Sequence, residues 1–254
     1  IGRYVLQHSQ GCKLTYISSE RFMNEMINAV RYDRILDFRE RYRTVDVLRQ
    51  SPPAGWIEEA RDIVAKFPEF LDEYERLLNE NEIMIARTQG VGVLAPELAV
   101  NASITGPMLR ASGVNYDLRK VDKYGIYDRF DFDVVTAENG DCWDRWYVRL
   151  QEIRESVKII QQAVDSIPSG DLQAKVPKVI KVPKGETYVR AENPKGEMGY
   201  YLVSDGGQDP YRLKIRSASF SNISILPWIL EGALVPDIIA IMGSLDFVLG
   251  DIDR

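Results

Sequence analysis

The sequence predicts an α+β fold in which a mainly helical bundle carries a small inserted antiparallel sheet. Apolar residues recur at helical spacing over residues 56–78 and again over residues 141–167. Residues 178–218 instead consist of short β-like runs separated by turn sequences. Residues 220–242 return to an apolar helical pattern. A small sheet that interrupts a set of packed helices is typical of the α+β class.

The composition is that of a globular protein of one or two domains. The chain has 254 residues, of which 45% are hydrophobic and 28% charged, and its net charge is −6. This charge argues against nucleic-acid binding by the chain as a whole. No apolar run approaches the roughly 18 residues that span a bilayer, and no basic-then-apolar signal peptide is present. We therefore expect a cytosolic protein, which can still sit on a membrane-bound assembly.

Cysteine and histidine are too few to support several kinds of site. Cys12 and Cys142 lie far apart and neither belongs to a C-x-x-C pair, so a disulfide framework or thiolate metal site is not expected. His8 is the single histidine, which leaves almost no material for a zinc site or a Ser-His-Asp triad. The residues predict neither a metal site nor a catalytic residue.

The first 48 residues differ from the rest and predict an N-terminal αβ fragment. A short strand at residues 14–17 is followed by a helix over residues 20–30 and a second, basic helix over residues 33–43. Residues 49–55 contain Ser-Pro-Pro-Ala-Gly, which cannot continue a helix and indicates a linker. The chain therefore divides into residues 1–48, the junction 49–55 and a larger part, residues 56–254.

The larger part begins with helices. The apolar stripe over residues 56–78 contains Pro68, which predicts a kink or a second helix start. The run from Ile83 to Ile85 predicts a short strand. Residues 90–95 match the dinucleotide pattern G-x-G-x-x-A, but the following helix, Pro96 to about Asn101, is too short for a βαβ unit. A loop capping a helix start explains these glycines better.

Residues 105–119 and 127–131 combine glycines with arginines and aspartates, which indicates an internal ion-pair network. The network either holds loops in place or lines a functional cavity. Asp141 is a natural N-cap for the longest helix, and Cys142 beside it is expected to be a packing residue. The apolar stripe of this helix comprises Trp143, Trp146, Tyr147, Leu150, Ile153, Val157, Ile160, Val164 and Ile167.

The sheet region contains three turn signals, at residues 183–186, 194–197 and 204–207, which predict an antiparallel meander. The first two signals have the sequence Pro-Lys-Gly-Glu. A phosphate-binding loop would need a following helix, and none is predicted, so turn chemistry explains the repeat better.

Three motifs resemble one family. They are Thr-Gly-Pro-Met-Leu-Arg-Ala-Ser-Gly (105–113), Gly-Glu-Met-Gly-Tyr-Tyr-Leu-Val-Ser-Asp-Gly-Gly (196–207) and Asp-Phe-Val-Leu-Gly-Asp-Ile-Asp-Arg (246–254). Together they resemble the C-terminal half of the hydrogenase-like, D-type subunit of respiratory complex I. Hydrogenase large subunits end in Asp-Pro-Cys-x-x-Cys; Asp246 matches, but Val248 and Asp251 replace the thiolates that hold the metal, so no metal is expected.

The resemblance implies a subunit of NADH:quinone oxidoreductase with a hydrogenase large-subunit-like fold, inactive alone. It would lie in the peripheral arm, on the cytoplasmic side of the inner membrane, where electron transfer is coupled to proton translocation. Its partners would be other peripheral-arm subunits, quinone as substrate and, by association, the membrane arm. The iron–sulfur cluster would belong to a neighbouring subunit, and this chain would bind no cofactor itself. Nicotinamide binding at residues 90–95 is not expected.

The family's tail lines the quinone cavity, so the resemblance makes Asp246, Val248 and Asp253 the candidate quinone-cavity residues. The alternative is a buried, hydrogen-bonded chain end. The family's proton donors, a His and a Tyr, have no counterpart in the matching segment, and His8 lies outside it. No catalytic residue is carried over.

Residues 16–31 and 38–48 resemble a different family, the AAA+ domain of the replication initiator DnaA. The resembling piece lies between Walker A and Walker B, and this chain has neither, so ATP hydrolysis is excluded. Nine basic against six acidic residues in 1–50 would bind DNA weakly and in a salt-dependent way. A fragment that binds single-stranded DNA and a recombined chain without activity remain the alternatives.

Overall fold

The computed structural model describes residues 55–168 and 182–253. The chain divides into two compact units, and the larger consists of residues 61–166 and 177–254. The predictions for the DnaA-like segment 1–48, for most of the junction and for Arg254 lie outside the described residues. The architecture below concerns the larger unit.

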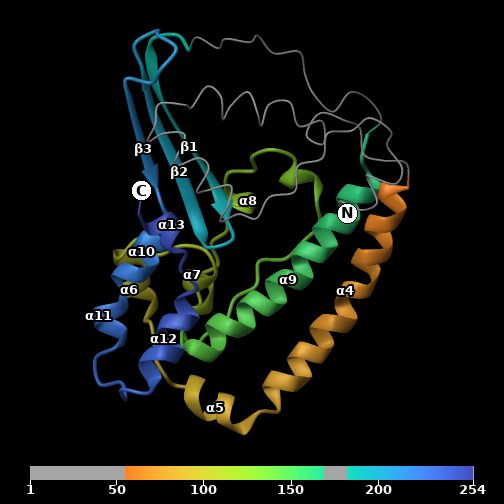
Figure 1. Cartoon of the computed structure of the whole chain (residues 1–254), viewed down its shortest axis with the longest axis vertical. Helices are drawn as coiled ribbons and strands as arrows, with labels where there is room; N and C mark the ends of the chain where they lie inside the picture. Colours follow the sequence, from red (N-terminus) through yellow and green to blue (C-terminus); the bar gives the residue numbers. More distant parts are fainter. Residues whose placement is uncertain (1–54, 169–181, 254) are drawn as a thin grey trace, which may run out of the picture. The chain divides into compact units, whose positions relative to one another are not determined.

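The described residues confirm the α+β class (Figure 1). Two long helices, α4 and α9, run side by side, and shorter helices precede and follow a small sheet. The elements are α4 (Trp56–Asn79), α5 (Glu82–Thr88), α6 (Pro96–Asn101), α7 (Pro107–Ala111), α8 (Leu118–Val121), the 3-10 turn η2 (Tyr127–Arg129), α9 (Cys142–Asp165), β1 (Gly185–Asn193), β2 (Gly196–Ser204), β3 (Arg212–Arg216), α10 (Ala218–Ser224), α11 (Leu226–Ile229), α12 (Asp237–Leu245) and α13 (Leu249–Ile252).

The predicted meander is confirmed as a three-stranded antiparallel sheet in the order β1-β2-β3. The β1–β2 pairing ends at Asn193 opposite Gly196, so Pro194 and Lys195 form the tip of a tight hairpin. The Asn193 side chain accepts a hydrogen bond from the backbone N–H of Lys195 (3.2 Å), as an Asx turn does. This turn fixes the direction in which Lys195 leaves the sheet.

The hydrophobic core lies where α6, α7 and the start of α9 meet α11 and α12. Its buried members come from segments far apart in the sequence, so the C-terminal helices complete a core that the earlier helices begin. They are Leu94, Ala99, Ile104, Met108, Leu109, Cys142, Ile225, Ile229, Ile241 and Leu245. The interpretation of Cys142 as a packing residue is confirmed, because the side chain is buried among these residues.

Helix α9 begins as predicted but buries only part of the predicted stripe. The Asp141 side chain accepts a hydrogen bond from the backbone N–H of Asp144 (2.8 Å), as expected of an N-cap. Ile153 and Ile160 are 40% and 47% exposed, however, whereas Arg145 is fully buried. The prediction is wrong here because it assumed that only apolar side chains turn inward, and a buried guanidinium is tolerated when its donors find acceptors.

Arg145 has such acceptors. Its guanidinium donates to the carbonyl oxygens of Gly140 (2.6 Å) and Gly92 (2.9 Å) and to the Ser244 hydroxyl (2.9 Å). The G-x-G-x-x-A segment is therefore a loop that accepts a hydrogen bond from α9, in agreement with the loop interpretation. Gly90 also donates its backbone N–H to the Asp141 carboxylate (2.8 Å).

One local prediction is wrong, and another is narrowed to one of its alternatives. Ile83 to Ile85 lie in helix α5, where the Asn81 side chain accepts hydrogen bonds from the first free N–H groups, rather than in a strand. Helix α4 continues through Pro68 without a second start, so of the two predicted alternatives only a kink within one helix remains. The short helix Pro96–Asn101 is confirmed as predicted.

The sheet meets the helical part at two glycines. A Cβ atom on Gly106, whose φ is +70°, would lie 2.7 Å from the backbone nitrogen of Gly196. Gly196 in turn precedes Glu197, whose backbone N–H donates to the Thr105 hydroxyl (2.9 Å). This close backbone approach seats the β1–β2 hairpin against the start of α7.

We expect Gly106→Ala to destabilise the protein more than Gly125→Ala. Gly125 has a similar φ of +65° but open space around it, so alanine there adds only the left-handed strain of about 1–2 kcal/mol. Alanine at Gly106 adds a backbone clash of roughly 1–3 kcal/mol. Urea unfolding followed by circular dichroism measures both losses. Equal losses would show that the hairpin does not rest on Gly106.

Candidate functional site

A cavity of about 370 Å³ opens between the β1–β2 hairpin, helix α9 and the end of α12. Charged side chains dominate its lining. Its cations are Arg110, Arg119, Arg149 and Lys195, and its carboxylates are Glu152, Glu192 and Asp246. Tyr127 and Ser156 add two hydroxyl groups. We call this space the charged cavity.

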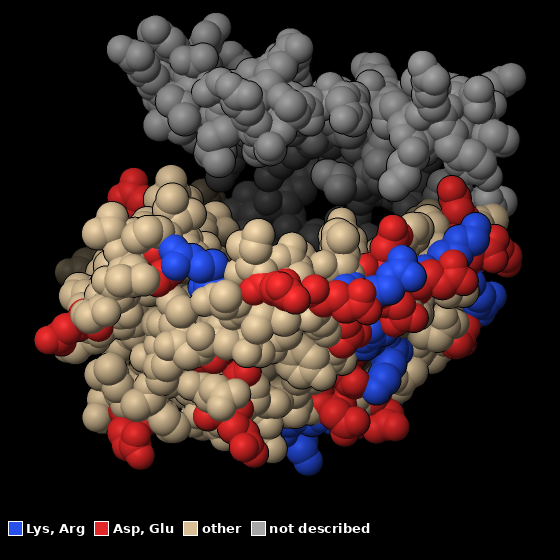
Figure 2. Space-filling view, turned by 90° about the horizontal axis from the view of Figure 1, so that it is seen from below, with Lys and Arg blue, Asp and Glu red and all other residues tan. Residues whose placement is uncertain are grey.

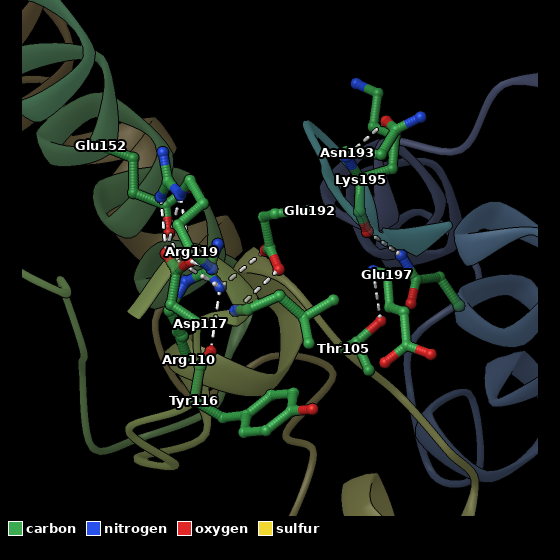
Figure 3. A network of polar contacts seen from close by, with 12 residues as sticks. Thr105, Arg110, Tyr116, Asp117, Arg119, Glu152, Glu192, Asn193, Lys195 and Glu197 are labelled. Atoms are coloured by element: carbon green, nitrogen blue, oxygen red, sulfur yellow. Dashed lines mark hydrogen bonds and ion pairs between the residues drawn. The ribbon is translucent and has the colours of Figure 1, made fainter. Parts of the chain in front are cut away.

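Arg110 of α7 organises one wall of the charged cavity. Its side chain is 2% exposed, and its Nε donates to Glu152 Oε1 of α9 (2.5 Å). Its Nη1 donates to Glu192 Oε1 of β1 (2.9 Å) and to the backbone carbonyl of Tyr116 (3.0 Å). Figure 3 shows these acidic groups converging on one guanidinium. The predicted ion-pair network is confirmed for residues 105–119, and it also lines a cavity, so both of its expected roles are compatible. The prediction is wrong for residues 127–131, whose charged side chains are exposed and lie outside this network.

Asp117 and Arg119 extend the network from the start of α8. Arg119 Nη2 donates to Asp117 Oδ2 (2.5 Å), and the Asp117 side chain also caps the helix by accepting from the Arg119 backbone N–H (2.9 Å). Burial alone would raise the pKa of Asp117, but the hydrogen bonds and charge of Arg119, with the charge of Arg110, hold it below its ordinary value. Asp117 is therefore ionised at neutral pH.

Glu192 shows the opposite balance. Burial raises its pKa above the ordinary value for glutamate, and the positive charge of Arg110 offsets this only in part. Its other oxygen accepts from the backbone N–H of Leu118 (3.3 Å). The ionised form of Glu192 therefore depends on the neighbouring guanidinium.

Lys195, Asp246 and Arg149 form the opposite wall. Lys195 Nζ donates to Asp246 Oδ2, and Arg149 Nε lies 3.4 Å from the same oxygen. Asp246 follows α12 in the left-handed conformation (φ +52°, ψ +42°), which turns its side chain out of the helix path. Aspartate is one of the few residues that adopt this conformation at modest cost.

The positive charge of Arg149 is destabilised by burial. Burial lowers its pKa to about 10, and Asp246 offsets only part of the effect. Its Nε makes no hydrogen bond within the described residues, whereas Nη1 donates to the Arg145 carbonyl (2.8 Å). Because Nε is buried beside Asp246, Arg149 contributes positive charge to this wall of the cavity.

The structure separates the three predicted quinone-cavity residues. Asp246 lines the charged cavity, but Val248 and Asp253 are not among its lining residues. Val248 is half exposed and donates its backbone N–H to Ser219 Oγ (3.3 Å). The side chain of Asp251 accepts from the backbone N–H of Ser219 (3.0 Å), which ties the tail to α10. The tail thus combines one cavity residue with a hydrogen-bonded anchor.

Sequence reasoning does not find Arg149 and Lys195 as site residues. The sequence shows Lys195 only as part of a turn and Arg149 only as a polar position on α9. One available signal is the spacing of Arg145, Arg149 and Glu152, which places all three on one helix face. A charged row on the inward side of a long helix favours a polar cavity.

No cluster of His, Cys, Asp or Glu within residues 55–168 and 182–253 has the arrangement needed to hold a metal ion. Within the same ranges, the helices are too short or too polar to cross a bilayer.

The sequence of this chain places it in a known class of respiratory-chain proteins. The family profile of the respiratory-chain NADH dehydrogenase 49 kDa subunit matches residues 25–181 and 175–254. The chain therefore belongs to this family, and the predicted relationship to the hydrogenase-like, D-type subunit of complex I is confirmed.

Relatives in the family are about 50% identical to this chain over the matched region. The D-type subunit of NADH-quinone oxidoreductase from Dehalococcoides mccartyi is 50% identical over 81% of this chain and 56% of its own length. Those of Bacillus mycoides and Desulforamulus reducens are 49% and 50% identical, over 84% and 79% of this chain and 58% and 55% of theirs. The chain thus spans little more than half the length of these relatives.

We expect Arg110→Met to lower the free energy of unfolding by about 3–5 kcal/mol, because buried carboxylates lose their counterion. The loss should shrink as the pH falls from about 8 to 5. Without Arg110, the folded-state pKa values of Glu192 and Asp117 rise, so their penalty is relieved on protonation. Urea unfolding at several pH values measures this loss of stability.

Arg61→Met, which removes an exposed partner of Asp165, is the control, and its free energy of unfolding should stay near that of the wild type. A loss independent of pH would contradict the electrostatic account.

Proposed function

We propose that this chain functions as part of the 49 kDa subunit of NADH:quinone oxidoreductase and helps to form the cavity in which quinone is reduced. The observation that carries the proposal is the identity of about 50% to D-type subunits of this enzyme over four fifths of the chain. Such identity over a continuous region favours the same role in the same assembly. The proposed wider fold is the hydrogenase large-subunit-like bundle.

The charged cavity supplies groups suited to a quinone headgroup. Lys195 and Arg149 carry N–H donors beside a common carboxylate, Asp246. Reduction of a quinone to a quinol takes two electrons and two protons and passes through forms with negative oxygens. Cations placed where that charge develops stabilise it, most strongly in a cavity with little water. We propose that Lys195 and Arg149 have this role and that Asp246 positions them.

The electrons must come from outside the described residues. We propose that an iron–sulfur cluster of a neighbouring peripheral-arm subunit delivers them and that this chain holds no redox cofactor. In the assembly the chain would lie at the cytoplasmic side of the inner membrane, beside the membrane arm, where quinone chemistry is coupled to proton translocation. Other peripheral-arm subunits would be its direct partners.

A hybrid protein tests the function. In the Bacillus mycoides relative, the matched region is replaced by the corresponding residues of this chain, and NADH:quinone reduction is measured in membranes. We expect activity in the hybrid. Lys195→Met should lower the rate roughly tenfold or more because the developing oxygen charge loses a donor. Lys214→Met, on the exposed part of β3, should leave the rate unchanged.

Assembly is checked in the same membranes by the amount of the hybrid protein that co-purifies with its neighbouring subunits. An assembled hybrid without activity would refute the functional proposal. Full activity of the Lys195→Met hybrid would refute the role of Lys195 alone.

A further inference from the structure

Glu192 of β1 is a buried acidic side chain that lines the charged cavity. Acidic side chains mostly face water, and the surface seen from the end where α5 lies carries many of them (Figure 2). The side chain of Glu192 is only 6% exposed. Burial of a carboxylate is unfavourable unless a cation compensates its charge or a proton removes it.

The cations beside Glu192 do not match the carboxylates one to one. Arg119 pairs with Asp117 (2.5 Å). Arg110 is shared by Glu152 at 2.5 Å and Glu192 at 2.9 Å, so among the described residues of this network one guanidinium faces two carboxylates. Glu192 is the more buried of the two, at 6% against 19% exposed. The proton that balances the charge is therefore expected on Glu192.

The wider surroundings of Glu192 also carry a surplus of acidic groups. Glu197 lies directly opposite it in the β1–β2 register, so the two side chains are on one face of the sheet. Burial raises the pKa of Glu192 above its ordinary value; the charge of Arg110 opposes this shift, and the charge of Asp117 adds to it. Within the described residues, the ionisable groups that face Glu192 from neighbouring elements are Arg110, Asp117, Arg119, Tyr124, Glu152 and Glu197.

We propose that Glu192 donates one of the two protons that reduction of quinone to quinol consumes. A quinone carries its two oxygens at opposite ends of the ring, and each oxygen gains a proton. Lys195 and Arg149 face one oxygen from the wall that contains Asp246, and Glu192 faces the other oxygen from the opposite wall. This role rests on the proposed function of the cavity and assigns its protonation step to a residue.

The protonation step balances in atoms and charge. Once electrons from the neighbouring iron–sulfur cluster have made the quinone oxygen negative, the O–H bond of the Glu192 carboxyl group breaks and an O–H bond forms at that oxygen. No electron moves in this step. Glu192 is left as a carboxylate, which Arg110 stabilises from 2.9 Å, and a proton from water restores the carboxyl group. An acid that holds its proton close to neutral pH is best suited to such a transfer.

The hybrid of the Bacillus mycoides relative tests the role of Glu192. Glu192→Gln keeps the size of the side chain but removes the transferable proton. We expect kcat to fall about tenfold to a hundredfold and KM to stay within about twofold, because Lys195 and Arg149 still bind the headgroup. Glu186→Gln, at the exposed start of the same strand, is the matched control and should keep the wild-type rate.

The pH profile separates a proton donor from a structural residue. The rate of the wild-type hybrid should fall as the pH rises through the pKa of Glu192, because the ionised carboxylate has no proton to donate. Glu192→Gln should lack this decline. Glu192→Asp, which restores an acid at the same position, should show the decline again at a reduced rate.

Infrared difference spectroscopy of the full chain tests for the proton without enzyme activity. The carbonyl stretch of a protonated carboxyl group is resolved from the bands of a carboxylate. We expect a carboxyl band that persists above the ordinary pKa of glutamate and is absent from Glu192→Gln. A wild-type chain in which Glu192 ionises at the ordinary value would overturn the proposal.

The outcomes distinguish this proposal from the proposed function. An active hybrid in which Glu192→Gln has the wild-type rate would overturn the donor role and leave the quinone cavity in place. An assembled hybrid that is inactive before any substitution would refute the proposed function and the donor role with it. If Glu192→Gln does not assemble, the infrared titration decides, with the band assigned from its shift in Glu192→Asp.

Discussion

The structure depends first on the buried guanidinium of Arg110. One side chain joins three elements distant in sequence, because it binds Glu152 of α9, Glu192 of β1 and the carbonyl preceding α8. A buried cation must find an acceptor for each of its donors. That requirement fixes the position of the β1–β2 hairpin relative to α9 more narrowly than apolar contacts could, since apolar contacts have no direction.

The same constraint shapes the charged cavity. With the hairpin held by Glu192, its tip brings Lys195 close to Asp246 at the end of α12. Asn222 of α10 adds a second support by donating to the Lys195 carbonyl (2.9 Å). The positions of the two cavity walls are thus coupled. The ion-pair network fixes the wall formed by Arg110, and the β1–β2 hairpin joins this wall to the one formed by Lys195 and Asp246. Replacing Arg110 should therefore alter the position of Lys195, although no direct contact joins the two side chains.

Much of the fold could be predicted from local sequence. The sheet follows from its turn signals, and the N-cap at Asp141 and the helix Pro96–Asn101 follow from capping and proline rules. The strand predicted at Ile83 to Ile85 is wrong, because a three-residue apolar run does not distinguish strand from helix and the Asn81 cap decides the outcome. The inward face of α9 is missed for a different reason. Whether Arg145 is buried depends on acceptors supplied by Gly92 and Ser244, which only the tertiary structure brings near.

The candidate site shows the same division between local and tertiary information. Motif resemblance leads to Asp246, and the structure places it in the charged cavity, but Lys195 and Arg149 meet it only because the hairpin, α9 and α12 converge. The tail that follows Asp246 has a separate, structural role. Asp251, at a position where hydrogenases carry a metal-binding cysteine, accepts a hydrogen bond from the backbone of α10. A carboxylate in place of the thiolate thus anchors the chain beyond α12, and the backbone N–H of Val248, which donates to Ser219 Oγ, adds a second tie to α10.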